Sequence, residues 1–320
     1  MPSPGSFPSM SNAEISIVTN PAAGRGKARW LAEQVAAAVR RAGPVAEVVF
    51  TSGAGDARRL AAEAVANGAR VVAGCGGDGT LQEIASSLVG TECALGFVPV
   101  GRCNDLARAL GVFSKDPIER LAANLTSGRR RTIDLGTYRF RDASGQLGAP
   151  RYFCTVATLG FDSAVSRFVE QRRLPIKGTP AYLYGVIRVL SKYECPRVRL
   201  RGDFGELDER VLLAATGNTP FYGGAMQIAP GAKLDDGVFH VCVVKEVPQR
   251  TVLGILPRVF SGRHVDHPAA TVFRTQRLEL ETPDAPEWIC ADGETLGPTP
   301  AVLEVAAQVL HVQNPEKSLI

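Results

Sequence analysis

The chain has 320 residues, 45% hydrophobic and 21% charged, a composition that is typical of globular proteins and excludes a disordered or fibrous chain. The net charge of +4 is small, and the basic residues form short runs such as Arg129–Arg131, so we expect no nucleic acid partner. Seven scattered cysteines without C-x-x-C pairs argue against a zinc site or a disulfide framework and indicate reduced thiols.

Residues 1–12 are rich in Pro, Ser and Gly, and we expect a disordered tail there. They lack the charged and apolar regions of a signal peptide, and no run of about 18 apolar residues follows. We therefore expect a cytoplasmic protein that reaches lipid only as a peripheral protein at the inner face of the membrane.

Strands and helices alternate over residues 13–133, which predicts an α/β domain with a parallel sheet and ligands beyond the carboxyl ends of its strands. Short apolar runs predict the strands, and longer runs with helical periodicity predict the helices. The predicted strands are residues 15–18, 45–50, 71–73 and 94–98, and the predicted helices are residues 28–41, 56–67, 81–88 and 106–110.

Three loops follow strands of this predicted sheet. The glycine-rich turn Gly74–Thr80 lets main-chain N–H groups approach phosphate oxygens before a helix start, and Asp78 in it can hold a metal or order the loop. Asn20–Lys27 offers further N–H groups and two basic side chains. Pro99–Asp105 reaches the same edge of the sheet as Asp78. Plain turns, and a helix N-cap at Asp105, are the alternatives.

After Asp134 the pattern changes to strands separated by Gly and Pro turns, which predicts a second, mostly β domain with one helix. Asp236-Gly237 and Asp292-Gly293, taken alone, indicate hairpin turns. The predicted strands are residues 152–158, 197–201, 210–216, 238–244 and 277–281, the predicted helix is residues 181–191, and residues 139–151 are predicted to form an exposed turn.

The segment Phe168–Ser191 combines basic with apolar residues. Arg172, Arg173 and Lys177 predict a basic lip, and the apolar residues after them predict a wall for acyl chains at an anionic membrane. A core helix preceded by a solvated loop is the alternative.

Taken in order, these segments resemble the diacylglycerol kinase catalytic family, in particular bacterial lipid kinases related to sphingosine and ceramide kinases. The resemblance covers residues 15–315. It rests on Asn20-Pro21 with Gly24, Gly76–Thr80, Pro99 with Gly101 and Asn104-Asp105, Asp134–Gly136, the block from Gly223-Gly224 to Asp236-Gly237, and Asp292–Glu294.

The resemblance implies an α/β nucleotide-binding domain of the NAD kinase and diacylglycerol kinase type at residues 13–133. It further implies a β-sandwich lipid-substrate domain at residues 134–300, and a segment 301–320 that returns to the first domain. ATP would bind in the cleft between the domains. The implied reaction transfers the γ-phosphate of ATP to a lipid hydroxyl, foremost that of diacylglycerol, which yields phosphatidic acid for phospholipid biosynthesis. The implied partners are ATP, Mg²⁺ and lipid at a membrane surface, and a homodimer is allowed.

The resemblance also implies the roles of individual residues. Asp292 matches the proton acceptor. Main-chain carbonyls of Lys233 and Val238 and the carboxylate of Asp236 match a structural Mg²⁺ site. The positions matching nucleotide contacts are Asn20, Pro21, Ala22, Ala23, Gly24, Thr51, Gly76, Gly77, Asp78, Gly79, Thr80, Leu81, Gln82, Arg102 and Glu294, the last closing on the nucleotide.

Asp78, Asp105 and Asp134 match an acidic network that holds catalytic magnesium through water. If they converge with Asp292, each pair of carboxylates at about 4 Å repels by roughly 4 kcal/mol at an effective dielectric near 20, so a divalent cation is required. Ligand sets made only of oxygen favour Mg²⁺ or Ca²⁺.

The chain departs from the family at Arg102, where a threonine that contacts ATP is usual. A guanidinium can pair with a phosphate or crowd the site. Arg102 and Cys103 leave a catalytically silent nucleotide or lipid binder open as an alternative. A kinase of sphingoid bases, ceramide or another lipid, and a kinase of a soluble substrate like the NAD kinases, also stay open.

Overall fold

The computed structural model describes residues 13–101, 103–142, 144–172, 179–224 and 226–314, with the side chains of residues 170 and 179–183 left out. The tail expected at residues 1–12 lies outside this range, as do Arg102 and, from the predicted lip, Arg173 and Lys177. The chain forms two compact units. Among the described residues, the first contains residues 13–101, 110–131 and 310–314, and the second contains residues 103–109 and 132–309.

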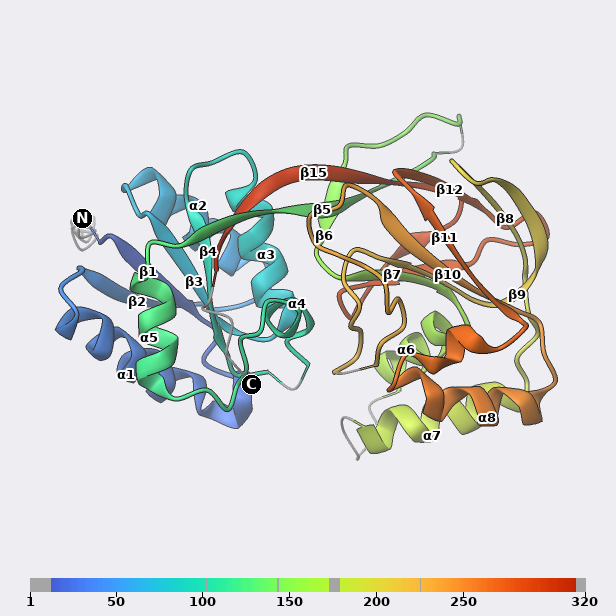
Figure 1. Ribbon diagram of the computed structural model, residues 1–320, viewed down its shortest axis with the longest axis horizontal. Helices are drawn as coiled ribbons and strands as arrows, with labels where there is room; N and C mark the ends of the chain where they lie inside the picture. Colours follow the sequence, from blue (N-terminus) through green and yellow to red (C-terminus); the bar gives the residue numbers. More distant parts are fainter. Residues whose placement is uncertain (1–12, 102, 143, 173–178, 225, 315–320) are drawn as a thin grey trace, which may run out of the picture. The chain divides into compact units, whose positions relative to one another are not determined.

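The first unit is an α/β domain, as predicted (Figure 1). Its parallel sheet has the order β2-β1-β3-β4, and Val312 at the end of β15 pairs with Leu95 at the outer side of β4. The strands are β1 (Ile15–Thr19), β2 (Ala46–Phe50), β3 (Val71–Gly76), β4 (Ala94–Pro99) and β15 (Ala301–Gln313), and the helices are α1 (Ala28–Arg41), α2 (Asp56–Ala66), α3 (Asp78–Leu88) and α5 (Ile118–Thr126).

Burial explains this arrangement. Every residue of β1, β3 and β4 is buried, as expected for parallel strands that helices cover on both faces. A Cβ at Gly74 would lie 2.6 Å from Leu81 of α3, so the absence of a side chain there lets α3 pack directly on β3. α5 was not predicted, and α3 begins at Asp78 instead of Leu81.

The second unit contains two groups of strands that share the long strand β9. One has the order β14-β13-β7-β9-β10-β11 and is antiparallel throughout. In the other, β9 pairs with β8, followed by β12, β15, β5 and β6. The strands are β5 (Arg130–Phe140), β6 (Arg151–Phe153), β7 (Val156–Gly160), β8 (Arg197–Gly202), β9 (Gly205–Gly217), β10 (Phe239–Lys245), β11 (Ala270–Thr275), β12 (Arg277–Glu281), β13 (Trp288–Ala291) and β14 (Glu294–Pro298).

Alternating side chains of β10 show how the layers are built. Phe239, Val241 and Val243 belong to the core between the strand groups, whereas Cys242 and Val244 pack under helices. The helices lie on one side of the unit (Figure 1). One helix was predicted here; besides the short α4 (Asp105–Ala109), the described residues form α6 (Phe161–Gln171), α7 (Thr179–Leu190) and α8 (Gln249–Val259), so that prediction was incomplete.

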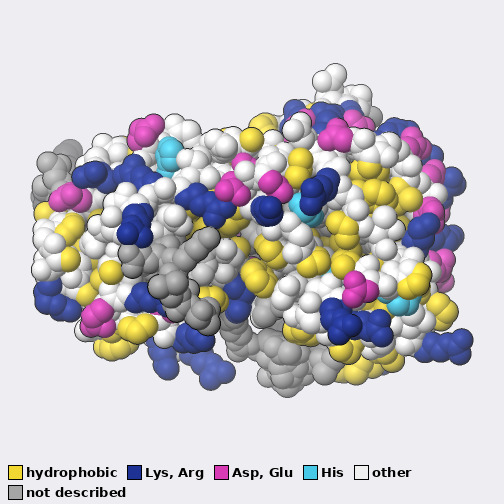
Figure 2. Space-filling view, viewed as in Figure 1, with side chains coloured by type: hydrophobic (Ala, Val, Ile, Leu, Met, Phe, Trp, Pro, Cys, Tyr) yellow, Lys and Arg dark blue, Asp and Glu magenta, His cyan; other side chains and the backbone are white. Residues whose placement is uncertain are grey.

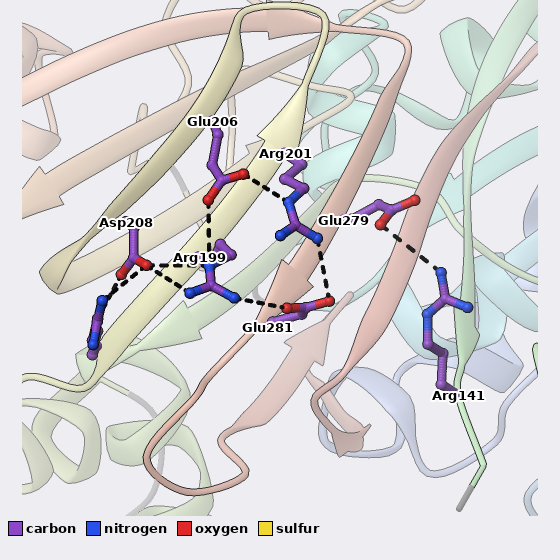
Figure 3. Close-up of polar contacts among 8 residues, drawn as sticks. Arg141, Arg199, Arg201, Glu206, Asp208, Glu279 and Glu281 are labelled. Atoms are coloured by element: carbon purple, nitrogen blue, oxygen red, sulfur yellow. Dashed lines mark hydrogen bonds and ion pairs between the residues drawn. The ribbon is translucent and has the colours of Figure 1, made fainter. Parts of the chain in front are cut away.

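The outward side chains of β8, β9 and β12 form a lattice of opposite charges (Figure 3). Arg199 stands opposite Asp208 in the β8–β9 register and bonds to it at 2.9 Å, and it also lies 3.6 Å from Glu281 on β12. Arg201 reaches Glu206 at 2.8 Å. Opposite charges across neighbouring strands favour one register, and the apolar residues between them then face the core.

The predicted strand 152–158 is wrong at its centre, because it breaks at Cys154-Thr155 into β6 and β7. The N–H groups of both residues bond to the carboxylate of Asp292. Consecutive N–H groups of a regular strand point to opposite sides, so the chain must leave the extended conformation to direct both at one carboxylate.

Candidate active site

Three loops of the first unit meet at the carboxyl edge of its sheet. The N–H of Asn20, just after β1, donates to the carbonyl of Cys75 in β3 at 2.9 Å, and the Asn20 side-chain oxygen accepts from Ala22 N–H at 3.0 Å. The carbonyl of Gly76 accepts from the N–H groups of Val100 and Gly101, each at 3.2 Å. The predicted phosphate loops therefore lie side by side.

Gly24 makes the closest approach among these loops. It adopts a left-handed conformation with φ of +59°, and an added Cβ would lie 2.1 Å from Cγ1 of Val100. Only glycine fits here, because a residue with a Cβ is strained in the left-handed conformation and its Cβ would clash with Val100. Arg25 and Lys27, which follow, are exposed and can reach an anion.

α2 and α3 both begin at this edge, and the start of α2 is already capped. The carboxylate of Glu83 already accepts the N–H groups of Gly55, Ala57 and Arg58 at 2.8 to 3.3 Å and so caps α2. α3 begins directly after the glycine turn, with Gly77 as N-cap and no side-chain cap. Asp78 thus lies in the first turn of α3, and Gly79, Thr80, Leu81 and Gln82 follow it in the same helix. The uncapped start of α3 with the glycine turn is an arrangement that suits a phosphate group. Thr51 follows β2 and donates its N–H to the Thr19 carbonyl at 2.9 Å.

In the second unit, Asp292 lies in a two-residue hairpin turn between β13 and β14. Asp292 and Gly293 have φ of 51° and 83°, and Ala291 pairs with Glu294. Two successive left-handed residues are typical of a tight hairpin, where Asp-Gly is favoured. The plain interpretation of this dipeptide as a turn is therefore correct for the backbone, and Glu294 is the exposed residue after it.

Within the described residues, Cys154 and Thr155 hold the Asp292 side chain by three hydrogen bonds. Its Oδ2 accepts the N–H of Cys154 at 2.7 Å, and its Oδ1 accepts the N–H and the hydroxyl of Thr155 at 2.8 and 2.6 Å. Cys154 and Thr155 are both 3% exposed. Hydrogen bonds from three donors favour the ionised carboxylate and fix its orientation.

Asp134 is the centre of a second group of hydrogen bonds in the same unit. Its carboxylate accepts the N–H groups of Gly237 and Gln308, each at 2.8 Å, and its own N–H donates to the carbonyl of Leu234. The buried amide of Asn218 donates to the carbonyls of Asp134 and Cys154, each at 3.0 Å. Asn218 thus joins the Asp134 segment to the segment that holds Asp292.

Asp105 is placed by a further loop. It is 5% exposed at the start of α4, and its carboxylate accepts the N–H of Gly224 at 3.1 Å. The glycine pair Gly223-Gly224, with φ of 60° and 87°, brings this N–H to the carboxylate. Asp105, Asp134 and Asp292 all belong to the second unit, whereas Asp78 belongs to the first.

Residues 233–238 form the loop predicted to hold a structural Mg²⁺. Asp236 directs one oxygen toward the N–H of Val238 at 3.4 Å and the other toward Nε2 of His240 at 3.3 Å. Burial lowers the pKa of His240, so this side chain is neutral at pH 7 and does not neutralise Asp236. A carboxylate together with the Lys233 and Val238 carbonyls is a donor set that suits Mg²⁺, so the residues present fit this ion.

An apolar cavity of about 60 Å³ lies in the second unit, under the helix layer. Val252 and Val259 of α8 line it, together with Phe161 at the start of α6. Its polar lining groups include Asp162 and the fully buried His264, whose pKa is lowered by burial. The lining contains no lysine or arginine and is mostly apolar, with Asp162 as an acidic group in it.

Sequence reasoning missed Thr155 and Asn218. Asn218 was given no role, and Thr155 lay inside a predicted strand. Both residues form hydrogen bonds to partners distant in sequence: Thr155 to Asp292, 137 positions away, and Asn218 to Asp134 and Cys154. Among the described residues, no helix combines the length and the apolarity needed to cross a membrane.

Glycine-rich loops at the carboxyl edge of an α/β sheet, followed by a β domain that carries ordered carboxylates, are typical of a nucleotide-dependent phosphotransferase. Two family models match the chain: the diacylglycerol kinase catalytic domain at residues 14–138 and the YegS C-terminal NAD kinase beta sandwich-like domain at residues 155–314. The chain belongs to the diacylglycerol kinase catalytic family, which makes it a member of the lipid kinases that use ATP as phosphate donor.

Named relatives agree with this assignment. The chain is 33% identical over 304 residues to the "Diacylglycerol kinase" of Mycobacterium tuberculosis (strain ATCC 25618 / H37Rv), which covers 94% of this chain and 95% of the relative. It is 32% identical over 292 residues to the "Probable lipid kinase YegS-like" of Pseudomonas aeruginosa, which covers 89% and 91%. A crystal structure of a diacylglycerol kinase from Bacillus anthracis str. Sterne shares the fold, with a TM-score of 0.70, 19% identity and coverage of 96% and 99%.

Proposed function

We propose that the chain transfers the γ-phosphate of ATP to the hydroxyl of diacylglycerol, which yields phosphatidic acid for phospholipid synthesis. The Asp292 carboxylate, ordered by three hydrogen bonds, is the observation that carries the proposal. A relative over nearly the whole chain is named diacylglycerol kinase, which supports this acceptor. The apolar cavity without basic residues suits an uncharged lipid, although it is smaller than the roughly 300 Å³ of common ligand pockets and must widen to take an acyl chain.

In the proposed reaction the lipid hydroxyl oxygen bonds to the γ-phosphorus while the bond from that phosphorus to the β–γ bridging oxygen breaks. The electron pair of the broken bond leaves with ADP, and the hydroxyl proton passes to Asp292. The transition state is loose and the proton leaves late, so a weakly basic carboxylate needs only to orient the hydroxyl and then accept its proton.

Transfer of labelled γ-phosphate into micelles of diacylglycerol, ceramide, sphingosine and monoacylglycerol, with NAD as a soluble acceptor, tests the proposal. We expect label in diacylglycerol, and Asp292→Asn should lower turnover about a hundredfold or more. An asparagine amide cannot accept all three hydrogen bonds, so part of the loss could be structural. Asp203→Asn is the matched control, since Asp203 accepts a threonine hydroxyl and a main-chain N–H from Thr275 and Gln276. Label in no acceptor would favour the silent binder, and Arg102→Thr would then be tested first.

A sphingoid base is the second candidate acceptor, favoured by Asp162 in the cavity lining. Asp162 accepts the Thr158 hydroxyl at 3.1 Å, and a carboxylate at this place can pair with the cationic amine of such a base. In that case Asp162→Asn should lower turnover of sphingosine much more than turnover of diacylglycerol.

We propose Mg²⁺ in two roles. Lys233, Asp236 and Val238 would hold a structural ion that orders the loop around Asp134, and an ion carried with ATP would neutralise charge on the phosphates. We expect bound magnesium by atomic absorption, its loss in Asp236→Ala, and its retention in Asp235→Ala, which removes the neighbouring carboxylate. Equal magnesium content in both variants would contradict the structural site.

We propose that α7 and α8 face the membrane surface. Tyr184 and Ile187 of α7, Leu253 of α8 and Phe260 directly after it are apolar but 39% to 59% exposed. Exposed arginines accompany them, and Figure 2 shows hydrophobic and basic side chains mixed along the lower edge of the second unit.

Sedimentation with vesicles tests this face. Wild-type protein should bind vesicles that contain anionic lipid, and Ile187→Gln should bind them less. Trp30→Gln, which changes an equally exposed side chain on α1, should bind as wild type does. Binding that ignores both the anionic lipid and Ile187 would contradict the proposal. The homodimer that the family allows is tested by light scattering of the same protein.

A further inference from the structure

We propose that Thr155 is a positioning residue for Asp292 and that Asn218 fixes the main chain from which Thr155 acts. This inference rests on the proposed function, because it assigns the orientation of the proton acceptor to residues outside the recognised motifs. It follows from the hydrogen bonds around the break between β6 and β7.

Among the described residues, the Thr155 hydroxyl donates to the Asp292 carboxylate from a side chain, whereas Cys154 and Thr155 donate main-chain N–H groups. The hydroxyl lies 2.6 Å from Oδ1, the same oxygen that accepts the Thr155 N–H at 2.8 Å. Two donors from one residue on one oxygen fix the carboxylate in rotation as well as in position. The backbone of Asp292 cannot do this alone, since the hairpin turn sets its φ and ψ but leaves the side-chain torsions to be set by contacts.

The position of Thr155 is in turn fixed by hydrogen bonds to two main-chain carbonyls, its own and that of Cys154. The Asn218 amide donates to the Cys154 carbonyl at 3.0 Å, and the N–H groups of Asn218 and Thr219 donate to the Thr155 carbonyl at 2.8 and 3.2 Å. The segment Cys154-Thr155 is therefore bound on its N–H side by Asp292 and on its carbonyl side by the end of β9. Asn218 is 1% exposed, so its hydrogen bonds do not compete with water.

The second bond of the Asn218 amide, to the carbonyl of Asp134 at 3.0 Å, extends the effect. Asp134 and Asp292 belong to segments that no sequence motif connects. The Asn218 amide donates to the main-chain carbonyl of Asp134 and to that of Cys154, whose N–H bonds to Asp292. A shift of the Asp134 segment would reach Asp292 through this amide.

Kinetics of three variants test the proposal. Thr155→Val removes the hydroxyl but keeps both N–H groups, and we expect kcat to fall about 10- to 100-fold with KM for ATP unchanged, as for a small misplacement of a reacting group. Thr155→Ser retains the hydroxyl and should stay within about threefold of wild type. Thr216→Val is the matched control: its buried hydroxyl has no hydrogen-bond partner within the described residues, so its loss should leave kcat unchanged.

Unfolding of a double-mutant cycle gives a readout that does not need a substrate. Thr155→Val and Asp292→Ala should each lower the unfolding midpoint. The double variant should lose less than the two separate losses combined, because both single variants remove the hydrogen bond between the Thr155 hydroxyl and Asp292. Additive losses would refute the contact. Normal kcat in Thr155→Val, or equal losses in Thr155→Val and Thr155→Ser, would refute the positioning role, whereas absence of lipid phosphorylation by wild-type protein would refute the proposed function instead.

Discussion

Replacement of Gly24 by alanine should damage the first unit in two separable ways. The left-handed conformation, with φ of +59°, costs about 1 to 2 kcal/mol for a residue with a Cβ. The added Cβ would also lie 2.1 Å from Cγ1 of Val100, and such overpacking costs about 1 to 3 kcal/mol more. The loop or Val100 must move by roughly 1 Å to relieve the contact, which we expect to weaken ATP binding about tenfold or more.

Gly26→Ala separates the two effects. Gly26 has φ of +86° but nothing within 4 Å of an added Cβ, so this variant bears the conformational cost alone. Urea unfolding and calorimetric titration with ATP should therefore show a larger loss for Gly24→Ala than for Gly26→Ala, and Gly24→Ala/Val100→Ala should recover the difference. Equal losses in the two single variants, or no recovery in the double variant, would refute the inferred close approach.

Three further predictions follow from burial and charge. Burial lowers the pKa of His264, so the folded protein is destabilised as the pH falls below the unfolded pKa near 6.5, where the unfolded chain binds a proton that the folded one does not. Between neutral pH and about pH 5.5, the free energy of unfolding in urea should fall by up to about 1.4 kcal/mol, and by less in His264→Gln. Iodoacetamide should label the half-buried Cys103 long before Cys242, where burial raises the pKa of the thiol to about 12, and equal labelling of the native protein would contradict this. Arg277→Gln, which breaks the 2.5 Å pair with Glu304, should lower the unfolding midpoint more at about 0.01 M salt than at about 1 M, and a loss independent of salt would point to packing instead.

Local patterns predicted the first unit well. The helix at Ala28–Arg41 was predicted at its observed bounds, and the strands β1 to β4 were predicted within a few residues of theirs. Short apolar runs between glycines and prolines leave few other choices of secondary structure. The position of the loops predicted to bind phosphate could be foreseen for the same reason, since each follows its strand directly.

Long-range contacts account for the elements that were missed. Residues 152–158 have the composition of one strand, and at Cys154-Thr155, where it breaks, its main chain bonds to Asp292 and Asn218, which are distant in sequence. The helix α8 was missed because it contains Pro257, which usually ends a helix. It also packs against β10, a contact that no local sequence pattern reveals. The role of Asn218 depends on two carbonyls from other segments, which no local pattern contains.

The pairing of Val312 with Leu95 has a consequence for biosynthesis. Residues from Leu310 onward belong to the first unit, so that unit lacks its last strand while residues 132–309 are translated. At 5 to 20 residues per second this interval lasts roughly 10 to 35 s. Throughout it the fully buried strand β4 has an open edge, which is a template for wrong pairing with other chains. We infer that the nascent chain is most prone to aggregation in this interval.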